Sequence, residues 1–270
     1  MLVFALLAAC APDAPPPSTP AVVVALPAHA RFPTAADALR HVLTVANPKV
    51  LGVGEIHAKT DGPAGPTTLA RFTAELFPVL APNTTDLVLE TWRLDGRCGA
   101  GEEAVATQVA DDTKRPEATK SELVLLIEAA VAQNVRPHDL AIACAEYAAL
   151  LDPEGNVAYD ALLRLLTVKL GAFAETGAAT PDATVVLYGG AVHNDVAPSE
   201  TLAPYSYGAA AAARGRYVEL DLYDPALLRA TPALVEEDWA PLLGEAGPGH
   251  ALLYTRRADS FVLILPEAGT

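Results

Sequence analysis

The sequence predicts an α/β fold: a mostly parallel sheet flanked by helices, with antiparallel strands at the C-terminal end. Short uninterrupted apolar runs alternate along the chain with segments whose apolar residues recur every three or four positions. Uninterrupted runs of this length are typical of strands that are covered by helices on both faces of a sheet. The last two runs are separated by only a few residues, which favours an antiparallel hairpin.

Length and composition favour one large domain, which we place at residues 33–268. The chain has 270 residues, of which 51% are hydrophobic, enough to build a single substantial core. Its net charge is -15, with 18 Lys and Arg residues spread along the chain. Because a phosphate backbone is bound through clustered cations, this balance argues against nucleic acid as a partner.

The first ten residues resemble a bacterial lipoprotein signal segment. The run "MLVFALLAAC" is apolar and has small residues before Cys10, and a Pro/Ala-rich tether is expected at residues 11–32. The run is too short to span a bilayer. Cleavage before Cys10 and lipidation of its sulfur would anchor the protein in the cell envelope, at the outer membrane or facing the periplasm. The alternative is a fortuitously apolar N-terminus.

Helix and strand alternate through the first half of the domain. A helix is expected over Thr34–Val45, because its apolar residues share one face, and another from Leu69 to Leu80, which Pro82 ends. Continuous apolar runs predict strands at Lys49–Gly54 and Asp86–Glu90. Residues 97–120 are Gly-rich and charged, and we expect a surface excursion there.

The second half continues the alternation and ends in β-structure. Helical spacing predicts helices over Leu123–Ala130 and Tyr159–Phe173, and apolar runs predict strands at Asp139–Cys144 and Val185–Tyr188. Residues 217–224 alternate apolar with acidic side chains, as in a strand with one wetter face. A closing hairpin is expected from Ala251–Tyr254 and Phe261–Leu265, with its turn near Ala258 and Asp259.

Three of the predicted strands end in polar residues suited to chemistry. The first ends in Gly-Glu-Ile-His, which supplies Glu55 and His57, the second ends at Glu90, and the fourth is followed by His193. Carboxyl ends of parallel strands meet at one edge, where open α/β sheets bind ligands. Two imidazoles with one or two carboxylates can hold Zn²⁺ or Mn²⁺ and leave a position for an activated water. We therefore expect Glu55, His57, Glu90 and His193 to act as catalytic residues, as metal ligands or as both.

These motifs also resemble a known superfamily. "LGVGEIHAK", "LVLETW" and "VVLYGGAVHND" are similar, in this order, to segments of the erythromycin esterases, the ChaN-like haem-uptake lipoproteins, the Tiki proteases and the TraB/GumN proteins. The resemblance spans about residues 35–265 and implies an EreA/ChaN-like α/β domain. Its site residues would be Glu55 and His57, then Glu90, then His193. The sequence departs from the ChaN-like pattern at Ala58-Lys59-Thr60, where an acidic or amide residue and a further His are common.

The resemblance implies three different uses of the same residues. Tiki-like members imply a metal-dependent peptidase, whereas erythromycin esterases imply a histidine that activates water with help from a glutamate. ChaN-like members imply haem or iron binding without catalysis. Whether the chain is an enzyme stays open at this point. The first hypothesis is an envelope-anchored hydrolase of a small-molecule or peptide substrate, with the haem-binding lipoprotein as its alternative.

Other residues are weaker candidates. Arg93 and Asn194 could contact substrate, and Tyr205 or Tyr207 could face the site or ligate haem iron, although a surface arginine, a loop turn and core tyrosines explain them as well. Cys98 and Cys144 remain once Cys10 is set aside. In an exported chain they could form a disulfide, and two unpaired buried thiols are the alternative.

Overall fold

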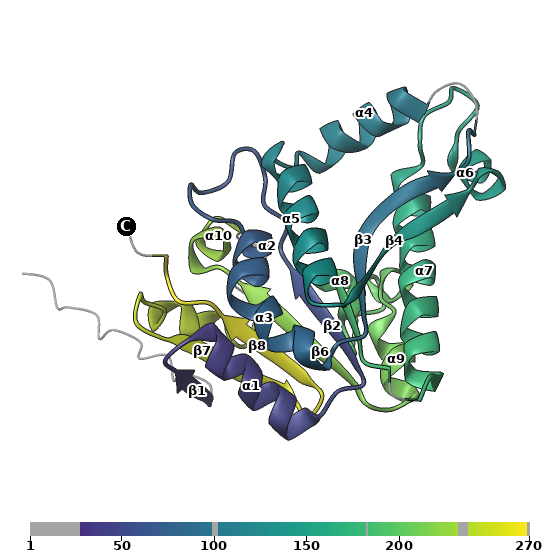
Figure 1. Ribbon diagram of the computed structural model, residues 1–270. Helices are drawn as coiled ribbons and strands as arrows, with labels where there is room; N and C mark the ends of the chain where they lie inside the picture. Colours follow the sequence, from purple (N-terminus) through teal and green to yellow (C-terminus); the bar gives the residue numbers. More distant parts are fainter. Residues whose placement is uncertain (1–27, 99–101, 182, 232–236, 269–270) are drawn as a thin grey trace, which may run out of the picture.

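The described part of the chain folds around one twisted eight-stranded sheet. The computed structural model describes residues 28–98, 102–181, 183–231 and 237–268. The strands lie in the order β1-β7-β8-β6-β2-β5-β3-β4 (Figure 1). β7 pairs antiparallel with both β1 and β8, and the other pairings are parallel. The predicted fold class is therefore confirmed. The strands are β1 (His29–Phe32), β2 (Val50–Glu55), β3 (Asp86–Asp95), β4 (Arg136–Ala143), β5 (Val185–Gly190), β6 (Tyr217–Tyr223), β7 (Ala251–Arg257) and β8 (Ser260–Ile264).

Helices cover both faces of the sheet, as the continuous apolar strands predict. One face packs against α1 (Ala35–Ala46), α2 (Thr68–Arg71), a π-helical turn (Phe72–Leu76), α3 (Phe77–Leu80) and α5 (Ala118–Ala132). The other packs against α6 (Cys144–Leu150), α7 (Tyr159–Ala179) and α9 (Gly208–Ala213) (Figure 1). Alternate residues of one strand serve the two cores: Val50 belongs to the core beneath α7, and Leu51 belongs to the core on the opposite face of the sheet. Shorter elements are α4 (Glu102–Thr113), α8 (Ala191–Asn194), α10 (Pro225–Arg229) and 3₁₀ turns at Ala81–Asn83, Ala203–Tyr205 and Ala240–Gly244.

The first helix shows how local sequence sets an element's limits. The Thr34 hydroxyl accepts a 3.0 Å hydrogen bond from the Asp37 amide and caps the start of α1. Asn47 ends the helix in the left-handed conformation, at φ 42°, which asparagine tolerates better than most residues. The helix expected from apolar spacing therefore lies within one residue of its predicted place.

The sheet opens between β3 and β5, and this opening creates the site. The two strands pair only from Asp86 to Leu89. β3 then shifts register against β4 and continues beside it to Asp95, beyond its last pairing with β5. Figure 1 shows β3 and β4 running on together as a ribbon. Glu90 is thus the first residue of β3 without a partner on β5. β2 and β5 end at the same level, because Glu55 pairs with Gly190.

Four sequence expectations need correction. Residues 29–32, expected in the tether, form β1 and pair with β7 at the edge of the sheet. The excursion at 97–120 contains the helix α4, whose weakly patterned polar residues gave no helical signal. The strand expected to have one wetter face, β6, is buried along its whole length. β3 is also longer than predicted, because it continues past Glu90 beside β4.

The N-terminal predictions lie outside the described residues. These are Cys10, the signal segment and most of the tether. A search of the helices within residues 28–98, 102–181, 183–231 and 237–268 finds none with the length and hydropathy that crossing a bilayer requires.

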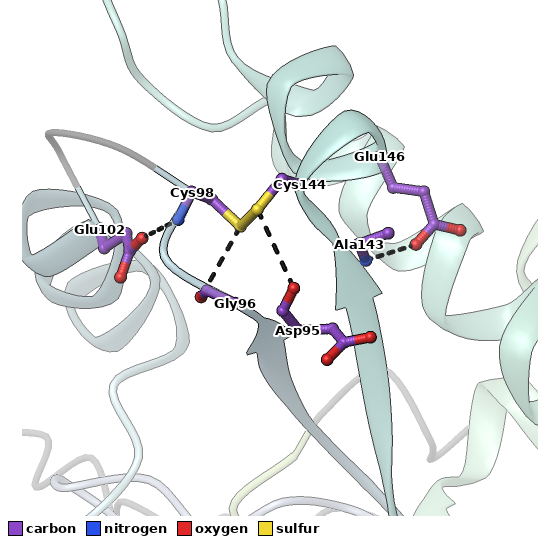
Figure 2. Close-up of a disulfide and its surroundings, with 7 residues drawn as sticks. All are labelled: Asp95, Gly96, Cys98, Glu102, Ala143, Cys144 and Glu146. Atoms are coloured by element: carbon purple, nitrogen blue, oxygen red, sulfur yellow. Dashed lines mark hydrogen bonds between the residues drawn. A yellow bond between two sulfur atoms is a disulfide. The ribbon is translucent and has the colours of Figure 1, made fainter.

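Cys98 and Cys144 form a disulfide that links the far ends of β3 and β4 (Figure 2). Their Cα atoms lie 4.9 Å apart, within the usual range for a disulfide. Cys144 directly follows β4 and begins α6, and Cys98 lies three residues after β3. Asp95 and Ala143, the last paired residues of these strands, lie beside the bond. The disulfide therefore closes the end of the β3–β4 ribbon that projects beyond the rest of the sheet.

Candidate active site

The first half of the site is a hydrogen-bonded pair at the end of β2. Nδ1 of His57 lies 2.9 Å from Oε1 of Glu55, which is 7% exposed. Because a carboxylate only accepts, Nδ1 carries a proton and donates it, and Nε2 is the nitrogen directed at the rest of the site. The other oxygen of Glu55 accepts a 2.6 Å hydrogen bond from the hydroxyl of Tyr188. Both oxygens of Glu55 are thus engaged, which fixes the orientation of the His57 ring.

The second half is Glu90, whose carboxylate lies between two imidazoles. Its Oε1 is 3.3 Å from Nε2 of His193, and its Oε2 is 3.7 Å from Nε2 of His57. Oε2 also accepts a hydrogen bond from the backbone amide of Gly190. The two histidines lie 136 residues apart in the sequence. The convergence expected from parallel strand ends is present.

Two glycines allow this close approach. A Cβ placed on Gly189 would lie 2.4 Å from Oε2 of Glu90, closer than such atoms can come. On Gly190 it would lie 3.2 Å from Nε2 of His57, in the space that Glu90 and both imidazoles face. The backbone of β5 therefore forms one wall of the site because it carries no side chains there.

His193 is held in a fixed tautomer by its surroundings. It lies on α8, directly after β5, and is 6% exposed. Its Nδ1 lies 2.6 Å from the carbonyl oxygen of Tyr205, which can only accept a hydrogen bond, so Nδ1 donates. The hydroxyl of Thr167, from α7, is 3.0 Å from the same nitrogen. These contacts leave Nε2 of His193 to face Glu90.

The electrostatics favour protonated imidazoles beside an ionised Glu90. Burial alone would lower the pKa of His57, but its hydrogen bond to Glu55 and the nearby Glu90 carboxylate raise this pKa to about 9. Burial also opposes charge on His193, yet the Glu90 carboxylate raises the pKa of that ring. Burial would raise the pKa of Glu90, and the two imidazoles hold it well below its usual range. The three side chains form one coupled set, in which each protonation state depends on the others.

The four residues line a cleft of about 980 Å³. The ring of His57 is 27% exposed and accessible from this cleft, whereas Glu90 and His193 lie deeper. One wall is apolar and includes Leu163, Val192, Val196 and Leu202. Charged residues line the rest of the cleft, among them Lys59, Arg115, Arg256 and Arg257. A cleft of this size accommodates a drug-sized molecule or a short peptide segment.

A buried acidic cluster on β6 supports the far side of the cleft. Glu219 and Asp221 are 0% and 2% exposed, and Nη1 of Arg256 lies 2.9 Å and 2.7 Å from them. Burial and the neighbouring Asp221 raise the pKa of Glu219 to about 8, although Arg256 opposes the shift. The Glu219 carboxylate accepts from the Val196 amide, just beyond α8. The cluster therefore ties the His193 segment to the centre of the sheet.

The weaker sequence candidates lie elsewhere. Asn194 is buried and donates to the Gly52 carbonyl and to Asp221, so it holds α8 in place. Tyr207 is buried against Tyr217, with ring centroids 6.0 Å apart. Arg93 is exposed and pairs with Asp139 at 2.9 Å. None of these three residues lines the cleft, whereas Tyr205 does.

A metal centre is not found among the described residues. No group of three or more His, Cys, Asp or Glu side chains within them has an arrangement that could hold a metal ion. Each oxygen of Glu90 instead faces a ring nitrogen at ion-pair distance. The donor types expected for Zn²⁺ or Mn²⁺ are therefore present, with the Glu90 carboxylate facing both imidazoles.

Three residues that shape the site are not apparent as site residues from the sequence. Tyr188 stands at the end of a predicted strand, and only the two-residue period of β-strands places it on the same face as Gly190. Thr167 lies within a helical stripe, where nothing marks it as a partner of His193. Arg115 lies in the charged segment after α4 and gave no sequence signal.

Comparisons with known proteins show only distant similarity. No protein-family model matches the chain, and a search of curated proteins finds no significant relative. Among solved structures, the type III effector HopBA1 is similar, with a TM-score of 0.43 and 12% identity over 90% of this chain and 98% of that one. ChaN of Campylobacter jejuni, described with cofacially bound haem, has a TM-score of 0.40 and 12% identity, covering 84% of this chain and 91% of its own. RRSP, a MARTX toxin effector domain from Vibrio vulnificus, has a TM-score of 0.31 and 17% identity, covering 72% of this chain and 38% of that chain.

Proposed function

We propose that this protein is a hydrolase in which His57 activates water for attack on an acyl group of a small-molecule or peptide substrate. The observation that carries the proposal is the cluster Glu55–His57–Glu90–His193 on one side of a cleft. Hydrogen bonds from both Nδ1 atoms direct the two Nε2 atoms toward a shared carboxylate. General acid–base catalysis requires such groups, oriented and coupled to one another.

The reaction begins with His57 neutral and His193 protonated. Nε2 of His57 takes a proton from water, and the oxygen attacks the acyl carbon while Glu55 stabilises the imidazolium that forms. His193 gives its proton to the departing oxygen or nitrogen as the acyl bond breaks. Glu90 lies between both rings and returns the proton from His57 to His193. The balance is one water consumed, with one acid and one alcohol or amine released.

The tautomers of the two histidines are the strongest support for these roles. Glu55 occupies Nδ1 of His57, and the Tyr205 carbonyl occupies Nδ1 of His193. Each ring can therefore exchange a proton only through the nitrogen that faces Glu90. Every step of the proposed reaction uses these side chains alone.

Hydrolysis of p-nitrophenyl esters and fluorogenic peptides by the purified full chain tests the proposal. His57→Gln and His193→Gln are expected to lower kcat/KM by about 10²- to 10⁴-fold, the usual contribution of acid–base groups. His138→Gln is the matched control, because His138 pairs with Asp86 at the opposite end of β3. Equal activity of all three variants, or an inactive wild type across both panels, would argue against the hydrolase.

A second candidate is a haem-binding protein without catalysis. The size of the cleft and its apolar wall favour it, since both suit a large flat ring. Tyr205 lines the cleft, but its hydroxyl is already bonded to Asp160 and to Arg164. Titration with haem, followed in the Soret band, separates the candidates. A stoichiometric shift that His57→Gln removes would favour haem binding over hydrolysis.

We propose in addition that the protein is anchored to the cell envelope through Cys10. The proposal is supported by the apolar run that ends in small residues before this cysteine. Incorporation of labelled palmitate during expression, and its loss in Cys10→Ser, is the expected result. Unlabelled wild type in the soluble fraction would contradict it.

A further inference from the structure

Arg115 differs from the other arginines that are sheltered from solvent. Within the described residues these are Arg71, Arg115 and Arg256. Arg71 pairs with Glu75 and Asp224, at 2.9 and 3.1 Å. Arg256 pairs with two buried carboxylates of β6. Arg115 forms no ion pair with any carboxylate of the described chain.

An unpaired and partly buried guanidinium is costly. Removing a charge from water is compensated only when an opposite charge or a full set of hydrogen bonds replaces the water. Two carboxylates, Glu55 and Glu122, line a small cavity together with Arg115, but both are engaged elsewhere. Glu55 accepts from His57 and Tyr188, and Glu122 accepts from Thr67 at 2.7 Å. Within the described residues, Arg115 thus lies close to carboxylates without forming a salt bridge to any of them.

The backbone holds Arg115 beside the proposed catalytic histidine. The carbonyl of Lys114 accepts a 2.9 Å hydrogen bond from the Thr60 amide, in the loop that follows His57. Lys114 itself is left-handed at φ 49°, and Pro116 restricts Arg115 to an extended backbone. The short connection from α4 to α5 is therefore tied to the His57 loop. Arg115 lines both the main cleft and an adjoining groove of about 280 Å³.

From this geometry we infer that Arg115 is a binding site for an anionic oxygen group, a carboxylate or a phosphate, carried by the substrate. The planar guanidinium presents paired N–H donors that match either group. Lys59 lines the same cleft and adds positive charge at its rim. An anion held here would lie beside His57 and would offset the repulsion between two neighbouring cations. The substrate role depends on the proposed hydrolase, whereas anion binding does not.

Anion titration tests the inference without any enzymatic assay. The ¹³C-labelled histidine rings of the full chain are followed by NMR while inorganic phosphate or sodium acetate is added. A saturable shift of the His57 resonances is expected, together with a higher pKa of that ring. The anion with the higher affinity, phosphate or acetate, indicates whether the substrate group is a phosphate or a carboxylate. Absence of a saturable shift with both anions would overturn the inference.

Variants assign the site to Arg115. Arg115→Gln is expected to weaken binding by about 10- to 150-fold, the value of hydrogen bonds to a charged group. Arg115→Lys keeps the positive charge but lacks the paired N–H donors of the guanidinium, so an intermediate loss of anion affinity is expected. If Arg115→Gln fails to fold, Arg115→Lys takes its place in the test. Arg136→Gln is the control, because Arg136 is exposed and pairs with Asp86 at the amino end of β3. Unchanged affinity in Arg115→Gln, or in a folded Arg115→Lys that replaces it, would refute the assignment.

Hydrolysis and anion binding can fail separately. If phosphate binds through Arg115 but no ester is cleaved, the anion site stands and the hydrolase is wrong. If esters are cleaved, a p-nitrophenyl ester with a terminal carboxylate is expected to have a lower KM than a neutral ester of equal length. Arg115→Gln should remove this difference. Retention of the difference in Arg115→Gln would overturn the substrate role of Arg115.

Discussion

The hydroxyl of Tyr188 donates a 2.6 Å hydrogen bond to Oε2 of Glu55, and both side chains are buried. The contact follows from strand register, because Tyr188 pairs with Val53, two residues before Glu55 on the same face of the sheet. The Tyr188 ring packs on Phe72, whose π-helical turn places it 4.5 Å away between centroids. Burial beside Glu55 raises the pKa of Tyr188 well above its ordinary value, so the hydroxyl remains a donor. Tyr188 thus fixes the carboxylate that orients His57.

Replacing Tyr188 with Phe should impair catalysis more than folding. The variant leaves one oxygen of Glu55 without its donor, and we expect kcat to fall about 10-fold at unchanged KM, as for the loss of one hydrogen bond to a charged group. Steady-state kinetics on the best ester substrate measures this split. Tyr147→Phe is a matched control, because the buried Tyr147 hydroxyl has no hydrogen-bond partner in the described residues. Equal kcat in both variants would show that Tyr188 does not position Glu55.

The pKa of about 9 at His57 predicts an alkaline optimum. The ring must be neutral to accept a proton, so kcat/KM should rise as the pH increases toward 9 and its base form becomes populated. The profile and the His57 titration by NMR should give the same apparent pKa. A titration midpoint at or below 6.5 would show that Glu55 and Glu90 do not stabilise the protonated ring.

Glu90→Gln should lower the pKa of both imidazoles at once. The substitution removes the negative charge that lies 3.7 Å from His57 and 3.3 Å from His193. Histidine titration by NMR measures both rings in one experiment. A pKa shift in only one of the two rings would show that Glu90 does not interact with the other ring, and would contradict the proposed proton path. Glu146→Gln is a suitable control, because Glu146 pairs with Lys169 outside the cleft.

The sequence was sufficient for the parts of the fold that depend on burial. Strands covered on both faces are continuous apolar runs, and β2 and β5 were found within two residues of their limits. The meeting of Glu55, Glu90 and His193 followed because parallel strands share one carboxyl edge.

Features that depend on distant partners could not be predicted from local sequence. Glu219 and Asp221 alternate with apolar residues and resemble a solvated face, yet Arg256, 35 residues beyond Asp221, allows both to be buried. Arg115 has no local pattern, since its position is set by the backbone contact between Lys114 and Thr60.

Arg256→Met should be strongly destabilising at neutral pH. It leaves the buried carboxylate of Asp221 without its cation, and Glu219 without its charged partner, at a cost of about 3–5 kcal/mol in the free energy of unfolding. Urea denaturation gives this value, and the loss should shrink at lower pH as Asp221 becomes protonated. Arg214→Gln removes only an exposed pair with Glu175, so about 1 kcal/mol or less is expected. Similar losses in both variants would mean that the buried cluster adds nothing to stability.

The raised pKa of Glu219 has its own consequence for stability. The folded protein holds this proton up to about pH 8, whereas an unfolded glutamate releases it near its usual pKa of 4.5. The stabilisation that Glu219 gives the folded protein is therefore fully present below pH 4.5 and is lost as the pH rises through 8. Glu219→Gln should remove this part of the pH dependence, measured as the difference between the two unfolding curves. Parallel curves from pH 5 to 9 would contradict a raised pKa.

Removing the Cys98–Cys144 disulfide should loosen the projecting β3–β4 ribbon while leaving the catalytic cluster assembled. The bond spans 46 residues, and closing a loop of this size is worth about 2–4 kcal/mol through restriction of the unfolded chain. The double variant Cys98→Ser/Cys144→Ser should lose that much in urea denaturation under oxidising conditions. Wild type with a reductant should match it. The NMR titration of His57 should stay unchanged in both, because Glu55 and Glu90, which face the ring, lie outside the looped segment, and Arg115 within it remains tied to the His57 loop through the Thr60–Lys114 hydrogen bond. A shifted His57 pKa in the double variant would show that the ribbon end also sets the geometry of Glu90.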